Sequence, residues 1–228
     1  MRRLLKKCAS IILIPLTEWY LRKERKYTLR GTAVTIMPGV FHPSIFHSTL
    51  FILQYLDRQV LAKKSFLELG SGTGLISIMA AKAKAYVTAT DLSLQAIENT
   101  RKNAKLNNVD IQIIHSDLFT SLDKKLFDWI VINPPYYAKD PQNDKDLAWY
   151  CGADFEYFQN LFGRLGEFIS PKTQVIMVLT KACDLEKIFA IAKQAGFEFH
   201  LLAENRVFFD EKDLLFQITF TAFDGRQV

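Results

Sequence analysis

The residues best suited to chemistry form two short motifs separated by about sixty residues. The first is Glu68-Leu-Gly-Ser-Gly-Thr-Gly74, and the second is Asn133-Pro-Pro-Tyr136, which ends an apolar run. Glycines let a backbone turn sharply off a strand and approach a ligand closely. An asparagine before two prolines offers oxygens that can hold the N–H groups of a planar nitrogen. Together the motifs predict a nucleotide-like pocket that faces a polar clamp for an amide or aromatic amine.

The glycine turn is the predicted cofactor site. Gly70 and Gly72 would open the turn, and a helix beginning near Leu75 would present free N–H groups. A dinucleotide fold uses the same device, but its G-x-G-x-x-G pattern requires glycine where Leu75 stands. Glu68 would also place a carboxylate beside a pyrophosphate, whereas a carboxylate suits the ammonium group of a methionine moiety. We therefore expect S-adenosyl-L-methionine and not a dinucleotide.

Two aspartates follow later apolar runs. Asp91 comes about twenty residues after the turn, where an acidic side chain can accept both ribose hydroxyls. It could also cap the helix that follows, and the two roles are compatible. Asp117 comes after the next apolar run and could accept from the adenine amino group. The alternative for Asp117 is a helix or turn cap.

The Asn-Pro-Pro-Tyr segment is predicted to hold the methyl acceptor. An amide or exocyclic amine is a poor nucleophile because its lone pair is delocalised. The Asn133 side-chain oxygen and the Pro134 carbonyl could accept its N–H groups and turn the lone pair toward a sulfonium methyl. Proline rings fix φ and remove competing donors, and the Tyr136 ring could stack on the planar target. The alternative is a Pro-Pro turn that only ends a strand.

These residues must be positioned by alternating strands and helices. Strands are predicted at 65–69, 86–90, 111–115, 127–132, 174–179, 197–203 and 214–223, and helices at 75–83, 94–106, 155–168 and 185–195. Apolar strands that alternate with helices indicate a parallel sheet covered on both faces. The last two strands lack a helix between them, so one should run antiparallel. Because ligands of such sheets bind at the carboxyl ends of strands, the motifs should meet in one crevice.

Composition indicates an ordinary globular protein. The 228 residues fit one domain, and 49% hydrophobic with 23% charged residues is typical of a soluble protein. Three cysteines and four histidines show no ligand spacing, so we expect neither a metal nor disulfides. A reducing, cytoplasmic setting is the corresponding expectation.

The net charge of +5 is concentrated near the N-terminus. Residues 1–30 hold nine Lys and Arg against two Glu, a net charge of +7, and the remainder carries −2. We expect a basic N-terminal helical arm over residues 1–33 and one domain over 34–228. The arm could contact an anionic surface, or it could be a solvated helix. Residues 1–16 imitate the charged and apolar regions of a signal peptide, but no cleavage site follows, and the apolar stretch 8–16 is too short to span a membrane.

At these residues the sequence resembles the class I S-adenosylmethionine-dependent methyltransferases, in particular the branch with an N-P-P-Y motif. That branch includes release-factor glutamine methyltransferases and several RNA and DNA amino-methyltransferases. The resemblance covers about residues 34–225 and implies an α/β, Rossmann-like, three-layer αβα fold. Its seven-stranded sheet would be mostly parallel, with an antiparallel C-terminal strand. The residues that it implies around the cofactor are Thr49, Glu68, Gly70, Gly72, Asp91 and Asp117, and those that would grip the acceptor are Asn133 and Tyr136.

The leading hypothesis is methylation of a planar amide or exocyclic amino nitrogen on a macromolecule, such as a protein glutamine or an RNA or DNA base. The basic arm favours nucleic acid, whereas Asp140, Asp144 and Asp146 lie where nucleic acid would approach. A second hypothesis is a transferase that moves an aminopropyl group from a decarboxylated form of the cofactor, but enzymes of that class would not need Asn-Pro-Pro-Tyr. The remaining alternative is a non-catalytic protein that binds the cofactor and docks to ribosome or membrane through the arm. Such a protein would be expected to lose the glycine turn or Asn133, and neither is lost.

Overall fold

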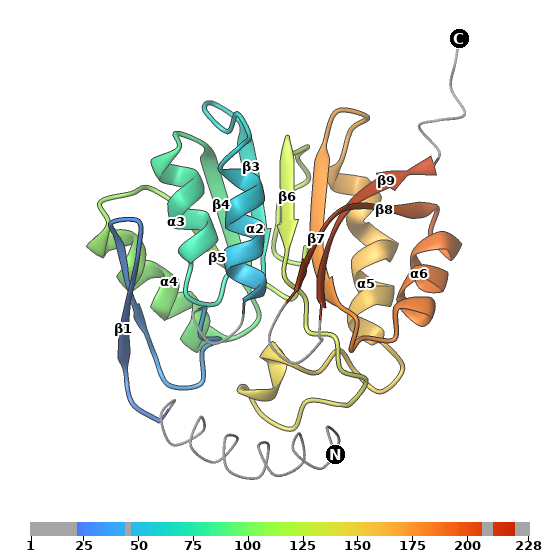
Figure 1. The fold of residues 1–228 in the computed structure, drawn as a ribbon, viewed down its shortest axis with the longest axis horizontal. Coiled ribbons are helices and arrows are strands. Elements are labelled where there is room, and N and C mark those ends of the chain that lie inside the picture. The colour runs from blue at the N-terminus through green and yellow to red at the C-terminus, as the bar shows by residue number, and fades with distance from the viewer. Residues whose placement is uncertain (1–21, 44–46, 207–211, 222–228) are drawn as a thin grey trace.

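A seven-stranded sheet runs through the molecule (Figure 1). The computed structural model describes residues 22–43, 47–206 and 212–221. Within them the strand order is β5-β4-β3-β6-β7-β9-β8. The strands are β3 (Ser65–Leu69), β4 (Tyr86–Asp91), β5 (Gln112–His115), β6 (Trp129–Ile132), β7 (Gln174–Thr180), β8 (Phe197–Arg206) and β9 (Lys212–Phe220). Strands β3 to β7 are parallel, and β9 is antiparallel to both of its neighbours. The predicted mostly parallel sheet with an antiparallel C-terminal strand is confirmed.

Helices cover both faces of the sheet. They are α2 (Ser48–Leu56), α3 (Leu75–Lys82), α4 (Leu94–Leu106), α5 (Glu156–Leu165) and α6 (Leu185–Gln194), with short 3-10 turns η1 (Asp146–Ala148) and η2 (Gly166–Phe168). Side chains alternate across each strand. In β6, Ile130 and Ile132 pack into the core with α5 and α6, whereas Trp129 and Val131 pack with α2 and α3. This alternation produces the three layers that were expected.

Local sequence signals predicted helix α4 correctly. Helix α4 spans Leu94–Leu106, as predicted, and the Ser93 side chain accepts from the Ala96 N–H at 3.3 Å as its N-cap. The helix ends at Asn107, and Asn108 has a left-handed φ of 52°. The other predicted strands and helices agree with the structure within a few residues at their ends.

The structure corrects the predicted N-terminal arm. Residues Arg25–Leu29 (β1) and Thr32–Ile36 (β2) form an antiparallel hairpin and not a helix. Its two-residue turn is Arg30-Gly31, both with positive φ, the geometry that matches the twist of paired strands. The many charges hid an alternation in which Tyr27 and Leu29 contact the core. Residues 1–21 lie outside the described residues, so the helix and its anionic contact remain predictions there.

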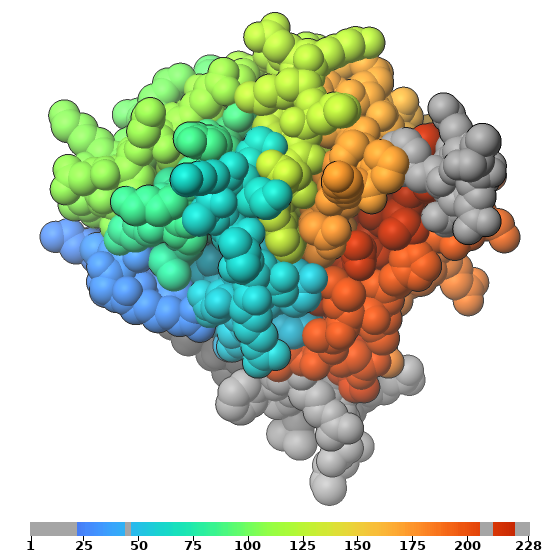
Figure 2. All heavy atoms as spheres, turned by 90° about the horizontal axis from the view of Figure 1, so that it is seen from above, coloured from blue at the N-terminus to red at the C-terminus, as the bar shows by residue number. Residues whose placement is uncertain are grey.

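Helix α2 was not predicted. Its sequence is apolar nearly all round, so a short run of this kind has no period that separates helix from strand. The segment that contains α2 (cyan) lies between the β1–β2 hairpin (blue) and the C-terminal strands (Figure 2). Phe51, Ile52 and Leu56 of α2 share one core with Val34 of β2 and Leu215 of β9. Burial on several sides explains the uniform hydrophobicity.

A row of buried polar residues on α4 holds the neighbouring loops. Asn99, Thr100 and Asn103 are fully buried. Asn103 accepts from the Thr35 N–H at 2.7 Å and donates to the carbonyls of Thr35 at 2.7 Å and Thr73 at 2.9 Å. Asn99 donates to the same Thr35 carbonyl at 2.7 Å. This polar row therefore joins the hairpin to the loop after β3.

Replacing Asn103 with alanine should destabilise the fold by about 2–4 kcal/mol. The substitution leaves the buried Thr35 N–H without its partner and removes one bond to the Thr73 carbonyl. Urea denaturation measures the loss. Arg101→Ala, on the exposed face of the same helix, should stay within about 0.5 kcal/mol of the wild type. Equal stability of the two variants would contradict the role of Asn103.

Candidate active site

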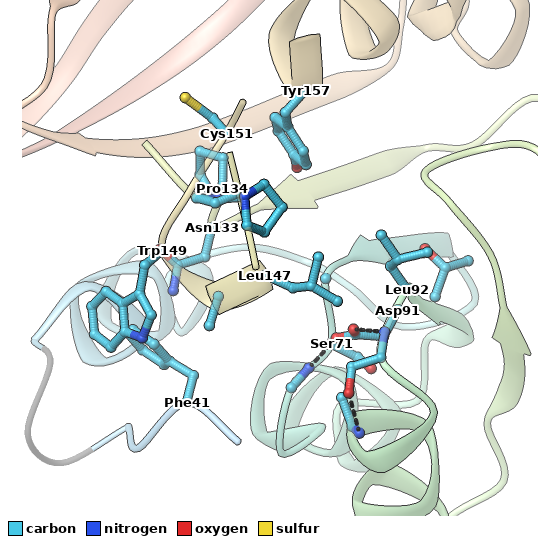
Figure 3. A pocket seen from close by; sticks show the side chains of 18 of the residues that line it. Phe41, Ser71, Asp91, Leu92, Asn133, Pro134, Leu147, Trp149, Cys151 and Tyr157 are labelled. Atoms are coloured by element: carbon cyan, nitrogen blue, oxygen red, sulfur yellow. Dashed lines mark hydrogen bonds between the residues drawn. The ribbon is translucent and has the colours of Figure 1, made fainter. Parts of the chain in front are cut away.

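All nine predicted site residues line one cavity of about 460 Å³. This volume is within the usual range for a small-molecule site. The cavity lies where β3, β4, β5 and β6 end, so the expected meeting of strand ends is observed. Figure 3 shows Ser71 and Asp91 at one end of the cavity and Asn133 at the other, with Leu147 between them.

The glycine turn begins directly after β3. Gly70, Gly72 and Gly74 have φ of 77°, 52° and 75°, which side chains rarely adopt. A side chain at Gly70 would meet nothing within 4 Å, so the backbone there is open to a ligand. A Cβ at Gly74 would come within 2.8 Å of Thr100, so this third glycine serves packing against α4. Gly74 is also the N-cap of α3.

Glu68 is the buried carboxyl beneath this turn. It is 4% exposed, and its Oε2 accepts from the Ser77 N–H at 2.9 Å and from the Ser77 hydroxyl. Burial raises the pKa of Glu68 to about 8, although the Ser77 hydrogen bonds oppose the rise, and the nearby Asp91 carboxylate adds to it. A cationic group in the cavity would favour the ionised form of this carboxyl.

Glu68→Gln should make the stability of the protein less dependent on pH. The ordinary pKa of this carboxyl is 4.5, so between about pH 4.5 and 8 the folded protein holds a proton that the unfolded chain has lost. Wild-type stability therefore falls as pH rises through this window. Glutamine stays neutral and still accepts from Ser77.

Urea denaturation at about pH 5 and about pH 8 checks this expectation. The free energy of unfolding of Glu68→Gln should rise relative to the wild type between the two pH values. Glu98→Gln, on the exposed face of α4, should follow the wild type. If the curves of Glu68→Gln and wild type run parallel, the raised pKa of Glu68 is contradicted.

Asp91 ends β4 and is held by two backbone groups. Its Oδ2 accepts from the Gly72 N–H and its Oδ1 accepts from the Ser93 N–H, each at 2.9 Å. Burial raises the pKa of Asp91, against these hydrogen bonds. The side chain that caps α4 is Ser93 and not Asp91. Each Asp91 oxygen thus keeps a lone pair that a ligand hydroxyl could use.

Asp117 also lines the cavity and is exposed. Its backbone carbonyl accepts from the Thr120 N–H at 2.9 Å, a turn after β5. Tyr157 of α5 lines the cavity too, and Figure 3 shows its side chain reaching into it. Burial raises the pKa of Tyr157, so the hydroxyl remains a neutral donor.

The Asn-Pro-Pro-Tyr segment lines the cavity at the end away from Asp91 (Figure 3). Asn133 follows β6 directly, and Pro134 is buried. The N–H groups of Tyr136 and Tyr137 both donate to the Trp149 carbonyl, at 3.1 and 2.9 Å. The Tyr136 ring packs against the core on the α5 side and meets the Tyr137 ring at 4.9 Å. The segment is therefore fixed by the loop before α5.

Sequence reasoning missed the aromatic wall around Asn133. Phe41, from the segment between β2 and α2, and Trp149, after η1, line the cavity with ring centroids 5.4 Å apart. Leu147 also lines the cavity, and Thr49 of α2 is buried in the cavity wall. The available sequence signal was weak: Trp149 is a large aromatic residue that follows the mainly polar stretch 139–146.

The cavity lining fits a cationic ligand. No Lys, Arg or His occurs among the described residues that line it, and the acidic residues there are Glu68, Asp91, Asp117, Asp140, Asp144 and Glu156. Desolvation raises the pKa values of two of these carboxyls, Glu68 and Asp91, and an ammonium and a sulfonium group would offset the rise. The open backbone at Gly70 fits the close approach of such a ligand. S-adenosylmethionine carries both an ammonium and a sulfonium group, so it fits this lining.

The described residues contain neither a metal-binding cluster nor a helix able to cross a membrane. Residues 22–43, 47–206 and 212–221 contain no cluster of three His, Cys, Asp or Glu side chains able to hold a metal ion. Within the same part of the chain, none of the helices has the length and apolar character needed to cross a membrane. The cytoplasmic setting remains a prediction.

The sheet order and the glycine turn beside an acidic strand end define the class I methyltransferase fold. The methyltransferase small domain model matches residues 31–190, and the chain belongs to this family. A relative from Methanocaldococcus jannaschii, named as a protein N5-glutamine methyltransferase, is 33% identical over 190 residues. The match covers 80% of this chain and 93% of the relative.

Two further matches cover smaller shares of the other protein's length. The release factor glutamine methyltransferase of Deinococcus radiodurans is 39% identical over 40% of this chain and 36% of its own length. The solved 16S rRNA N2 methyltransferase of T. thermophilus, with S-adenosylmethionine and guanosine, has a TM-score of 0.59 at 18% identity. It covers 85% of this chain and 50% of that chain, and it supports the fold. The chain is an S-adenosylmethionine-dependent methyltransferase whose relatives are named for protein and RNA acceptors.

Proposed function

We propose that the enzyme methylates the side-chain amide nitrogen of a protein glutamine. The observation that carries this choice is the charge of the cavity, which is lined by carboxylates and, among the described residues, by no basic side chain. A nucleotide brings phosphates close to its base, and proteins neutralise phosphates with Lys and Arg. Asp140 and Asp144 would instead lie close to those phosphates. A neutral glutamine side chain meets no such repulsion.

The part of the cavity around Asn133 suits an amide. The Asn133 side-chain oxygen and the Pro134 carbonyl would accept the two N–H groups of the acceptor amide. Held in this way, the amide nitrogen would rotate out of conjugation, and its lone pair would point toward the part of the cavity where the cofactor would bind. Bound S-adenosylmethionine supplies an activated methyl group. The methylated nitrogen is strongly acidic, so its proton can pass to water without a dedicated base.

The part of the cavity around Glu68 and Asp91 would bind the cofactor through acidic side chains. Glu68 would attract the ammonium group, Asp91 would accept from the ribose hydroxyls, and Asp117 would accept from the adenine amino group. Rate enhancement would then come from positioning and from charge complementarity. Cys151 lines the cavity, but burial raises the pKa of its thiol to about 11, so it is not available as a thiolate nucleophile. Methylation of carbon through such a nucleophile is therefore not favoured.

Transfer of tritiated methyl groups into extracts tests the proposal. Extract from cells that lack the enzyme is incubated with purified enzyme and labelled S-adenosylmethionine, and then divided between RNase and protease treatment. We expect protease-sensitive label that survives RNase, with N5-methylglutamine in an exhaustive enzymatic digest of the protein. Label that RNase removes would show a nucleic-acid acceptor and overturn the choice of protein. The control is Asn133→Ala, which should incorporate almost no label.

A further inference from the structure

Phe41 and Trp149 form an aromatic wall beside the proposed acceptor clamp. Their ring centroids are 5.4 Å apart at an interplanar angle of 48°, and both side chains are half-buried. Figure 3 shows the Asn133 side chain directed toward this pair, on the side of the cavity away from Asp91. Phe41, Trp149 and Asn133 all line the same cavity.

The main chain fixes Trp149 relative to Asn133. The Trp149 carbonyl accepts from the N–H groups of Tyr136 and Tyr137, and the Cys151 N–H donates to the Tyr137 carbonyl at 3.0 Å. Tyr137 and Tyr150 form a parallel bridge. The loop that carries Trp149 and the segment that carries Asn133 thus form one hydrogen-bonded unit. None of these bonds uses the indole side chain, so it can be replaced without removing them.

Phe41 is held from the other side. A Cβ at Gly72 would lie 3.9 Å from Val40 and 4.0 Å from Phe41, so this segment packs over the glycine turn. Strand β2, which precedes the segment, is bound to α4 through Asn103. Phe41 and Trp149 are therefore placed by two separate parts of the fold and meet at the cavity.

A planar acceptor needs a surface that sets its plane. Two oxygens that accept from the same nitrogen fix its position but allow the group to pivot about the line between them. An aromatic face in contact with the group removes this freedom and excludes water. A tetrahedral amine, such as a lysine side chain, has no flat face to place there.

We propose that Trp149, backed by Phe41, determines acceptor specificity by contacting the flat face of the amide held at Asn133. This inference rests on the proposed function, because it takes Asn133 as the acceptor clamp. The wall would select a planar nitrogen and would leave cofactor affinity unchanged. Trp149 is then a specificity-determining residue that the Asn-Pro-Pro-Tyr motif does not include.

Steady-state kinetics of Trp149→Ala and Trp149→Phe test the inference. The acceptor is RNase-treated protein extract from cells that lack the enzyme, and exhaustive labelling by the wild type measures its concentration of acceptor sites. For Trp149→Ala we expect KM for the acceptor to rise about tenfold, while the Kd for S-adenosylhomocysteine stays within about twofold. Trp149→Phe should recover most of the loss because it keeps an aromatic face. Tyr86→Ala, an exposed aromatic residue at the start of β4, should match the wild type.

Two results would overturn the inference. An unchanged acceptor KM in Trp149→Ala would mean that the indole does not contact the acceptor. Equal losses of acceptor and S-adenosylhomocysteine binding would make Trp149 part of the cofactor cover instead. Asn133→Ala in the same assay separates this inference from the proposed function. If Asn133→Ala stays active, the clamp fails; if it is inactive while Trp149→Ala is normal, only the wall fails.

Discussion

Asn133→Ala is expected to lower kcat about 10²–10³-fold, the usual loss when a preorganised hydrogen-bonding group is removed from an active site. The side-chain oxygen of Asn133 would hold the acceptor nitrogen with its lone pair toward the methyl group, so its loss acts on the reacting geometry. Asn133 lies at the far end of the cavity from Asp91. The Kd for S-adenosylhomocysteine should therefore stay within about twofold of the wild-type value.

A second substitution and a matched control sharpen this prediction. Asn133→Asp keeps an oxygen that accepts hydrogen bonds, so it should retain more activity than Asn133→Ala. Asn205→Ala, on the edge strand β8 and outside the cavity lining, should have wild-type kcat and affinity. Labelled methyl transfer gives kcat, and calorimetry gives the Kd. Wild-type kcat in Asn133→Ala would contradict the clamp.

Asp91→Asn is expected to weaken binding of S-adenosylhomocysteine about 100-fold, since hydrogen bonds to a charged group contribute roughly 1.5–3 kcal/mol each. Both Asp91 oxygens already accept from backbone N–H groups of Gly72 and Ser93. An asparagine NH2 group in either position would face an N–H donor, and it could not accept from a ribose hydroxyl. The substitution therefore affects the glycine turn and the ligand together.

Calorimetry with S-adenosylhomocysteine measures this effect. Asp110→Asn, an exposed aspartate just before β5 and outside the cavity lining, provides the matched control and should bind normally. A thermal melt of each variant shows whether the fold persists. If Asp91→Asn binds as tightly as the wild type, ribose recognition does not depend on this carboxylate.

The residues that follow sheet strands were predictable from sequence. Glu68, Asp91, Asp117 and Asn133 each lie in or directly after an apolar run, and parallel strands bring their carboxyl ends to one edge of a sheet. Their shared cavity follows from the strand pattern alone. Helix α4 was equally accessible, because the Ser93 cap and the two asparagines at its end are local signals.

The rest depends on contacts that a local pattern does not contain. Helix α2 is apolar nearly all round because several layers bury it, and strand β1 combines the charged Arg25 and Lys26 with half-buried Tyr27 and Leu29. Phe41 and Trp149 lie in loops, and only the closed fold brings them together. The alternation of Tyr27 and Leu29 with polar residues, followed by the turn residues Arg30-Gly31, could have revealed the hairpin, but the many charges suggested a helix.

The order of strands at the sheet's end has a consequence for synthesis. Strand β9 lies between β7 and β8, and β8 bonds to β9 alone among the described strands. During synthesis β8 is therefore completed before β9, the strand that lies between β8 and β7 in the sheet. Until residues 212–220 emerge, β8 exposes unpaired backbone groups together with Phe197 and Phe199, which is a state prone to aggregation. A chain stopped after residue 206 would remain in that state, and we expect it to require a chaperone to stay dispersed.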